Sequence, residues 1–283
     1  EILNIPSTTL IENWRSTVKN SALNDVLKNT FMSSQPIIII NKTDQEVIEN
    51  IQSNIHKVTV AMSKRSISSI LFWGMSKVLD NRPELIIAFG GIEESLIINV
   101  CGNASEAIRQ VIFVENYDTY TQMGRNDWIK SNEETILVYS SGFMASSSRI
   151  REKDKSIIHY ATHSKLDENS KNLFELWFYR EKTPSIKCFF FGDFDFSGIS
   201  IFMSLRNVFP EMCIFESGYD VMLNNVKLGL GHMPMMAKKE NQKDPVFVQD
   251  EYADVILLPA MRKYGFYDQE GISYESLFLK GDI

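Results

Sequence analysis

The feature that most constrains this chain is an apolar run that ends in two closely spaced carboxylates, at residues 189–198. Phenylalanines fill positions 189–191, and Asp193, Asp195 and Gly198 follow within seven residues. A short run of this type predicts a buried strand, here over residues 186–191. Side chains two residues apart on an extended chain point to the same side, so the two carboxylates are expected to converge.

Two carboxylates at the end of an apolar strand repel one another, and each raises the pKa of the other. A bound hard cation removes that cost, and oxygen-rich pairs of this type suit magnesium. The alternative role is structural, because Asp195 is placed to cap a helix that begins near Ser197. Asp193 has no such role, so the run predicts a divalent-metal site at the carboxyl end of a strand.

A third carboxylate follows another apolar run. Residues 111–114 predict a short strand, and Glu115 comes directly after it. In open α/β sheets, ligands lie beyond the carboxyl ends of the strands, so Glu115 is expected at the same edge as Asp193 and Asp195. Carboxylates of this kind hold magnesium together with water and substrate phosphates, and one or two such ions promote hydrolysis of a phosphodiester.

Acidic motifs in this order resemble a Toprim domain, the metal-binding fold of topoisomerases, primases and several nucleases. From about residue 57 to 275, the chain is similar to the JetD-type nuclease subunits of Wadjet plasmid-defence systems, relatives of the A subunit of topoisomerase VI. The family tends to have an arginine where this chain has Gly271. The segments that carry the resemblance are residues 65–80, 113–116, 140–143, 192–198 and 268–272.

The resemblance implies that Glu115, Asp193 and Asp195 bind Mg²⁺ or Mn²⁺ and that a metal-activated water cleaves DNA. It also implies double-stranded plasmid DNA as substrate, an SMC-type ATPase complex as partner, a homodimer and a cytoplasmic location. Residues 72–74 contain no tyrosine. Hydrolysis is therefore preferred to the covalent tyrosyl–DNA bond of the topoisomerase relatives.

Composition limits the partners that this chain can have. The 283 residues are 44% hydrophobic and 23% charged, as in an ordinary soluble globular protein. No apolar stretch approaches the roughly 18 residues of a membrane-spanning helix, and no signal peptide is apparent, so no membrane partner is expected. Cys101, Cys188 and Cys213 lie in apolar settings, which predicts buried thiols in a reducing compartment.

The formal net charge of −7 argues against a generic DNA-binding surface and suits an enzyme that a larger machine delivers to DNA. Local contacts with DNA remain available, among them the amides of a helix that is predicted to follow Ser141. The candidates for DNA contacts are Lys64, Arg65, Ser141 and Arg149, with a further basic cluster at Lys238, Lys239 and Lys243.

The indications of a functional role are weaker for other polar residues near these motifs. Asn116, Gly198 and Glu270 are candidates for supporting the metal ligands, and Asp118 is a further one. His159 and His163 have the spacing of some zinc sites on helices, but their neighbours favour a strand or loop. A solvated or packed histidine pair is therefore expected.

The sequence predicts an α/β protein with an accessory domain over residues 1–105 and a Toprim catalytic domain over residues 106–283. The accessory domain is expected to be a smaller α+β domain. Its helices are predicted near residues 8–18, 44–55 and 66–79, and its strands at residues 37–40, 86–89 and 96–100. A helix followed by a hairpin is typical of a winged helix, here over about residues 57–105; a small subdomain with a solvated basic edge is the alternative.

Strands and helices alternate from residue 104 onward, which predicts a mostly parallel sheet with helices on both faces. The predicted strands are residues 111–114, 136–139, 186–191 and 213–215. The predicted helices are residues 117–123, 144–151, 170–181, 197–208, 219–227 and 251–264.

Together these features predict a metal-dependent endodeoxyribonuclease. A non-catalytic DNA-binding or partner-binding subunit that keeps the Toprim fold is the first alternative, and the acidic net charge keeps it open. A phosphatase of the haloacid dehalogenase type is the second, because it also carries Asp-x-Asp after a strand. That reading leaves Glu115 without a role.

Overall fold

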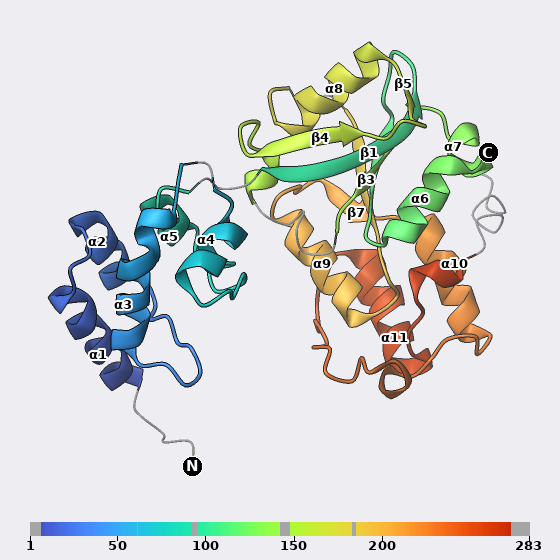
Figure 1. The fold of residues 1–283 in the computed structure, drawn as a ribbon. Coiled ribbons are helices and arrows are strands. Elements are labelled where there is room, and N and C mark those ends of the chain that lie inside the picture. Colours follow the sequence, from blue (N-terminus) through green and yellow to red (C-terminus); the bar gives the residue numbers. More distant parts are fainter. Residues whose placement is uncertain (1–6, 61, 92–94, 142–147, 183–184, 273–283) are drawn as a thin grey trace. The chain divides into compact units, whose positions relative to one another are not determined.

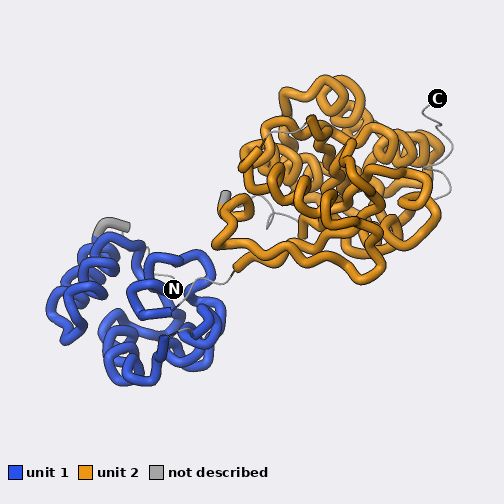
Figure 2. Tube along the Cα trace, turned by 90° about the horizontal axis from the view of Figure 1, so that it is seen from above, with its two compact units in different colours: residues 1–94 blue, residues 95–283 orange. Residues whose placement is uncertain are grey.

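The structure is a computed structural model, and it describes residues 7–60, 62–91, 95–141, 148–182 and 185–272. The chain divides into two compact units, Glu1–Glu94 and Ser95–Ile283, which Figure 2 shows in different colours. Each unit has a hydrophobic core of its own. None of the described helices is long and apolar enough to cross a lipid bilayer.

The described part of the first unit is helical. Its apolar faces bury Trp14, Phe31 and Phe72, and the indole N–H of Trp14 donates to the carbonyl of Phe31 over 3.3 Å. The helix α3 begins with a capping box, in which Thr43 and Glu46 satisfy each other's backbone N–H groups. The helices are α1 (Ser7–Asn20), α2 (Asp25–Ser33), α3 (Asp44–Asn54), η1 (Ile55–Lys57), α4 (Lys64–Leu71) and α5 (Pro83–Ala88).

The strands predicted for the first unit do not form there. Residues 86–88 belong to α5, which Pro83 begins, because proline at the first helical position already has the φ of a helix. Residues 37–40 form no strand either. A short apolar run does not distinguish a buried helix from a buried strand, and this ambiguity explains both errors. The expected α+β character and the hairpin of a winged helix are therefore wrong for the described residues of this unit.

The helix predicted over residues 66–79 is shorter than expected. Helix α4 ends at Leu71, because Trp73 and Gly74 both take the left-handed backbone conformation, with φ of 48° and 79°. Its N-cap is Ser63, whose side chain accepts the Ser66 N–H. The apolar residues of the sequence keep their helical spacing beyond Leu71, although the backbone leaves the helix there.

The second unit contains a seven-stranded sheet with the order β4-β1-β3-β2-β6-β7, and β5 pairs with β1. All pairs are parallel except β1 with β3 (Figure 1). The predicted α/β class with a mostly parallel sheet is thus confirmed. The strands are β1 (Leu96–Ala104), β2 (Gln110–Val114), β3 (Thr135–Tyr139), β4 (Ser156–Tyr160), β5 (Lys165–Leu166), β6 (Lys187–Phe191) and β7 (Met212–Ile214).

The strand β1 changes the expected division of the chain. Its first half was predicted as a strand of the accessory domain, but it pairs with β3, β4 and β5. The two compact units separate at residues 94 and 95, before β1. The strand β4, which carries His159, was not among the predicted strands, although the neighbours of His159 favoured a strand or loop.

Helices pack against the sheet, and in Figure 1 α8 lies above the strands whereas α9, α10 and α11 lie below them. The predicted helix at residues 144–151 falls largely outside the described residues, and its last residues form η3. The helices of this unit are α6 (Tyr117–Arg125), α7 (Asp127–Ser131), η3 (Ser148–Arg151), α8 (Glu168–Phe178), α9 (Phe196–Arg206), α10 (Glu216–Lys227), η4 (Pro234–Ala237), η5 (Ala253–Leu257), α11 (Leu258–Tyr264) and η6 (Gln269–Gly271).

The strands β2 and β6 are adjacent interior strands of the sheet. Val111, Ile112, Phe113 and Val114 are fully buried. The Phe190 and Phe191 side chains are fully buried as well. Strands covered on both faces are apolar throughout rather than alternating, which is why these two runs were visible in the sequence.

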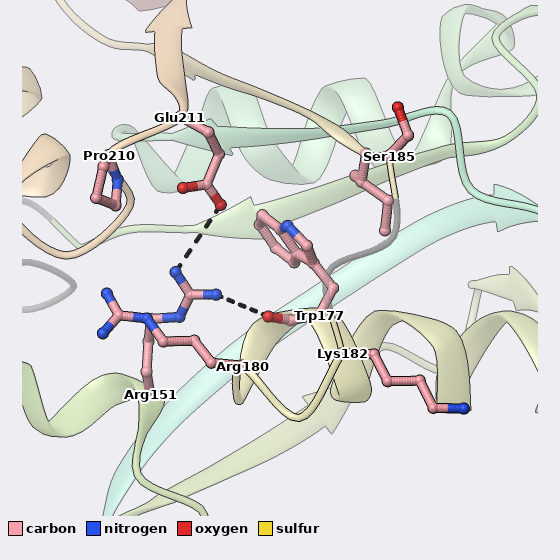
Figure 3. A pocket seen from close by; sticks show the side chains of 8 residues that line it. Arg151, Trp177, Arg180, Lys182, Ser185, Pro210 and Glu211 are labelled. Atoms are coloured by element: carbon pink, nitrogen blue, oxygen red, sulfur yellow. Dashed lines mark hydrogen bonds and ion pairs between the residues drawn. The ribbon is translucent and has the colours of Figure 1, made fainter.

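Arg151 holds the end of η3 against two other segments. Its guanidinium group donates to the carbonyls of Trp177 and Phe178 over 2.7 Å each, and to that of Val208 over 3.1 Å. It also lies over the ring of Phe209, 4.6 Å from the centroid. Figure 3 shows this side chain between the end of α8 and the turn before β7.

We expect Arg151→Met to lower the free energy of unfolding by roughly 2–4 kcal/mol, because the carbonyls of three buried residues each lose one hydrogen-bond donor. Urea unfolding of the purified protein measures the change. Lys153→Met is the matched control, since Lys153 is exposed, pairs with the exposed Glu181 and lies over the ring of Tyr179, so its loss should change stability little. Equal stabilities of the two variants would contradict the structural role of Arg151.

Candidate functional site

The loops that follow β2 and β6 lie next to each other, because these strands are parallel neighbours. Val114 is opposite Phe191 in the ladder, and the N–H of Glu115 donates to the carbonyl of Phe191 over 2.9 Å. The N–H of Asp193 in turn donates to the Oε2 atom of Glu115 over 3.2 Å. The structure thus brings Glu115 into contact with the aspartate motif, although 78 positions separate Glu115 from Asp193.

The two aspartates converge on one cationic atom, the Nζ of Lys239. This atom lies 2.7 Å from the Oδ2 atom of Asp195 and 3.3 Å from that of Asp193. It also lies 2.6 Å from the Oδ1 atom of Asp268. We refer to Glu115, Asp193, Asp195 and Asp268 as the carboxylate cluster.

Asp195 uses its two carboxylate oxygens differently. The Oδ1 atom accepts the N–H of Gly198 over 2.8 Å and so caps α9. The Oδ2 atom accepts from Lys239 and, over 2.9 Å, from the Nε2 atom of Gln242. The capping role that the sequence offered as an alternative and the convergence on a cation therefore occur together in one side chain, which is only 1% exposed.

A segment near the end of the described chain completes the cluster. Phe194 and Tyr267 exchange backbone hydrogen bonds, over 2.9 and 3.2 Å. This pairing places Asp268 beside Lys239. It also places Gln269 at the site, whose N–H donates to the Oδ1 atom of Asp193 over 2.9 Å.

Gln269 connects the ends of β2 and β6. Its side chain is fully buried. The Nε2 atom donates to the carbonyl of Phe191 over 3.1 Å, and the Oε1 atom accepts the N–H of Asn116 over 3.2 Å. Asn116 also caps α6 and donates a side-chain N–H to Glu270. Asn116 and Glu270 thus lie at the site as expected, and Gln269 is the residue between them that the sequence did not single out.

Two glycines leave room for the close approach of these loops. A Cβ atom at Gly192 would collide with the Oε2 atom of Glu115, and one at Gly198 would collide with the carbonyl oxygen of Asp193. Gly198 thus permits the close approach of the backbone at the start of α9. A larger residue at Gly198 would require the backbone to move, whereas one at Gly192 would displace the side chains of Glu115 and Phe190.

Burial changes the proton affinities of the cluster. It raises the pKa of Glu115 to about 7, and the nearby charge of Asp193 adds to this effect. Burial also raises the pKa of Asp193, although the hydrogen bond from Gln269 opposes the rise. Burial alone would lower the pKa of Lys239, but its hydrogen bonds to Asp195 and Asp268 outweigh that effect and raise the pKa.

The donor atoms of the cluster fit a hard divalent cation. Among the residues that the structure describes, no group of three or more His, Cys, Asp or Glu is arranged to hold a metal ion. Oxygens of three aspartates nevertheless surround a single cationic atom, and carboxylate oxygens are the ligands that Mg²⁺ and Mn²⁺ prefer. The chemical type of the donors is thus suitable, whereas their present partner is an ammonium group.

The predicted DNA-contacting residues lie in three places. Ser141 follows Ser140, whose N–H donates to the carbonyl of Val114 over 3.0 Å, so Ser141 is at the same edge of the sheet as Glu115. Arg149 is in η3. Lys64 and Arg65 begin α4 of the first unit, where Arg65 pairs with Asp80 over 3.1 Å. Residues 142–147, which carry the predicted N-terminus of the helix after Ser141, are outside the described residues.

Two smaller expectations have separate outcomes. His159 lies on β4, where its Nδ1 atom is 3.1 Å from the Oδ1 atom of Asn99, as expected of a strand residue rather than a helical zinc ligand. Cys101 and Cys188 are buried as predicted, but Cys213 is exposed. Its strand β7 ends the sheet, and the central residue of that strand points outward.

Sequence reasoning missed the cation of the cluster. Lys239 was grouped with Lys238 and Lys243 as a basic patch, yet its side chain is only 19% exposed and contacts three aspartates. Asp268 lies in the segment 268–272 that carries the resemblance but was not named as a site residue, and Gln242 was not singled out. Lys239 and Gln242 lie in a segment without helix or strand, so no periodicity reveals which of their side chains turn inward.

A cavity elsewhere in the second unit is a rival location for a site. It has a volume of about 540 Å³ and is lined by Arg151, Arg180, Trp177 and Glu211, among others (Figure 3). Arg151 and Arg180 both donate to the carbonyl of Val208, so these guanidinium groups already have protein partners. We therefore place the functional site at the carboxylate cluster.

Comparison of the sequence with protein-family models finds no match, and comparison with curated proteins finds none either. The similarity to Toprim domains and to JetD-type proteins therefore stays a prediction from the sequence. The function is inferred below from the geometry and charge of the site.

The raised pKa of Glu115 predicts a pH-dependent stability in the absence of metal. Between pH 4.5 and about 7, the unfolded chain has released this proton and the folded chain retains it. The free energy of unfolding of the wild type should therefore fall as the pH rises through this interval. Glu115→Gln removes this contribution and should be more stable than the wild type at pH 8 by roughly 1–3 kcal/mol, with little difference at pH 4.

Urea unfolding in the presence of a chelator measures this difference. Glu240→Gln is the matched control, because it removes an exposed carboxyl group outside the carboxylate cluster. A difference between Glu115→Gln and the wild type that is the same at both pH values would contradict the burial of an ionisable Glu115.

Proposed function

We propose that this protein is a metal-dependent endodeoxyribonuclease that hydrolyses phosphodiester bonds of double-stranded DNA. One observation carries the proposal. Carboxylates from the ends of two adjacent parallel strands, Glu115 after β2 and Asp193 and Asp195 after β6, meet at one edge of the sheet beside a cation. The carboxyl edge of a parallel sheet is where α/β proteins place their ligands.

Glu115, Asp193 and Asp195 would hold Mg²⁺ or Mn²⁺. Such an ion polarises a phosphoryl oxygen and favours the formation of hydroxide from water when it is bound. The backbone N–H of Gln269 and the cap at Gly198 keep the aspartates oriented, so that few side-chain torsions need to be ordered when the ion binds. Asp268 and Glu270 add negative charge to the same edge.

The resemblance to Toprim domains and to JetD-type nucleases agrees with this site and extends the proposal. On that basis the second unit is a Toprim domain, the DNA is plasmid DNA, and an SMC-type ATPase complex delivers the enzyme to it. The surface charge supports delivery by a partner, because a chain with a net charge of −7 has little general affinity for DNA. A homodimer would supply one active site to each strand of the duplex.

One observation favours a second candidate, a non-catalytic subunit that binds DNA or a protein partner. The Lys239 ammonium group already neutralises part of the carboxylate cluster, and a structural ion pair needs no metal. Metal binding separates the two candidates. A protein that binds neither Mn²⁺ nor Mg²⁺ and cuts no DNA alone or with an SMC-type complex would be the binding subunit.

We expect Asp193→Asn and Glu115→Gln to reduce Mn²⁺-dependent nicking of supercoiled plasmid by at least about 100-fold, because each removes a charged ligand of the ion. Gel assays with purified protein, alone and with the SMC-type complex, measure the loss. Asp154→Asn is the matched control, because Asp154 is an exposed carboxylate outside the carboxylate cluster.

Circular dichroism and thermal unfolding confirm that each variant is folded before its activity is compared. If Asp193→Asn and Glu115→Gln cut plasmid at the rate of Asp154→Asn, the assignment of the active site is wrong. Activity that persists in a chelator would contradict the metal requirement itself.

A further inference from the structure

We propose that Lys239 is a resident counter-ion that competes with the divalent cation for Asp193 and Asp195, so that the ion binds only when the ammonium group leaves. This inference rests on the proposed function, because it concerns the same carboxylates. It assigns to Lys239 a role that Glu115, Asp193 and Asp195 do not have. The protein would keep its acidic site neutralised while no metal is bound.

The contacts of Lys239 make the competition direct. Its Nζ atom contacts the Oδ2 atoms of both Asp193 and Asp195, at 3.3 and 2.7 Å. A divalent ion held by these two oxygens would need the space that the ammonium group occupies. Charge repulsion between the two cations at such a separation adds to the steric conflict. One site therefore cannot hold both.

The remaining oxygens of the aspartates are committed elsewhere. The Oδ1 atom of Asp193 accepts the N–H of Gln269, and the Oδ1 atom of Asp195 accepts that of Gly198. Both donors are backbone groups, one in η6 and the other in the first turn of α9. The aspartates thus cannot turn their other oxygens to an ion without breaking these bonds. The Oδ2 atoms face Lys239, which contacts both of them, and Gln242 also donates to that of Asp195.

Lys239 can leave without unfolding its surroundings. It lies in a segment with no helix or strand, between η4 and η5. Gln242 fastens this segment independently, because its side chain donates to Asp195 and accepts the N–H of Ser197 over 3.1 Å. The ammonium group is carried on a flexible stem of four carbons. Rotation of that stem alone removes it from the aspartates.

Asp268 fixes the resting position of Lys239. Its Oδ1 atom is 2.6 Å from the Nζ atom, and its side chain is 49% exposed. It is not among the three proposed metal ligands. It therefore stabilises the state in which Lys239 occupies the site, and its removal should favour the ion.

Titration calorimetry of the full chain with MnCl₂, without DNA, tests the competition. We expect Lys239→Met to bind Mn²⁺ at least about tenfold more tightly than the wild type, because the competing charge is gone. Asp268→Asn should also bind more tightly, by a smaller factor. Lys243→Met removes an equal charge from an exposed position outside the cluster and should bind like the wild type.

Thermal unfolding provides a second readout that does not depend on activity. Without metal, Lys239→Met leaves the aspartates without a counter-ion, and we expect its midpoint to fall below that of the wild type. Mn²⁺ should raise the midpoint of this variant more than that of the wild type, whereas NaCl of equal ionic strength should not. If Lys239→Met does not fold, the calorimetry of Asp268→Asn decides.

The outcomes separate this inference from the proposed function. Equal Mn²⁺ affinities of the wild type, Lys239→Met and Asp268→Asn would overturn the competition and leave a metal-dependent nuclease intact. Weaker binding by Asp268→Asn would also overturn it, because Asp268 would then be a ligand of the ion. Failure of every variant and of the wild type to bind Mn²⁺ would overturn both proposals.

Discussion

The parallel pairing of β2 with β6 is the interaction on which the candidate site depends. Both are interior strands of the sheet, and Val114 stands opposite Phe191. Both faces of these strands are packed, so a shift of the register by one residue would move large side chains into places that fit others. The packing of the core therefore favours this register, and the hydrogen bond from the N–H of Glu115 to the carbonyl of Phe191 continues it into the site. Glu115 and the two aspartates meet because they directly follow these two strands.

Nearby groups offset part of the electrostatic cost of placing these carboxylates close together. Among the described residues, one ammonium group, Lys239, contacts three aspartates, and backbone N–H groups donate to Glu115, Asp193 and Asp195. A buried charge without partners would cost several kcal/mol. The compensation is incomplete at Glu115, since burial and the neighbouring aspartate keep its pKa near 7. The folded protein thus retains unfavourable electrostatic energy at this edge of the sheet.

Much of the second unit could be predicted because its strands are buried. The runs at residues 111–114 and 186–191 correspond to β2 and β6, and the contact between Glu115 and Asp193 followed from the rule that ligands lie at the carboxyl ends of strands. The first unit was harder, because a short apolar segment such as that in α5 fits a helix and a strand equally. The position of Lys239 at the carboxylate cluster could not be predicted from the sequence. Its position depends on tertiary contacts of a segment that has no repeating pattern.

Asp195 illustrates how one side chain can make two functions inseparable. The Oδ1 atom caps the N-terminus of α9, and the Oδ2 atom accepts from the Lys239 ammonium group. A short acidic side chain at this position can make both contacts. Asparagine would keep the cap and lose the charge, whereas alanine would lose both. Glutamate would keep the charge and lengthen the arm beyond the geometry of a cap. The local architecture of α9 therefore restricts which residues are acceptable here, whatever reaction the protein carries out.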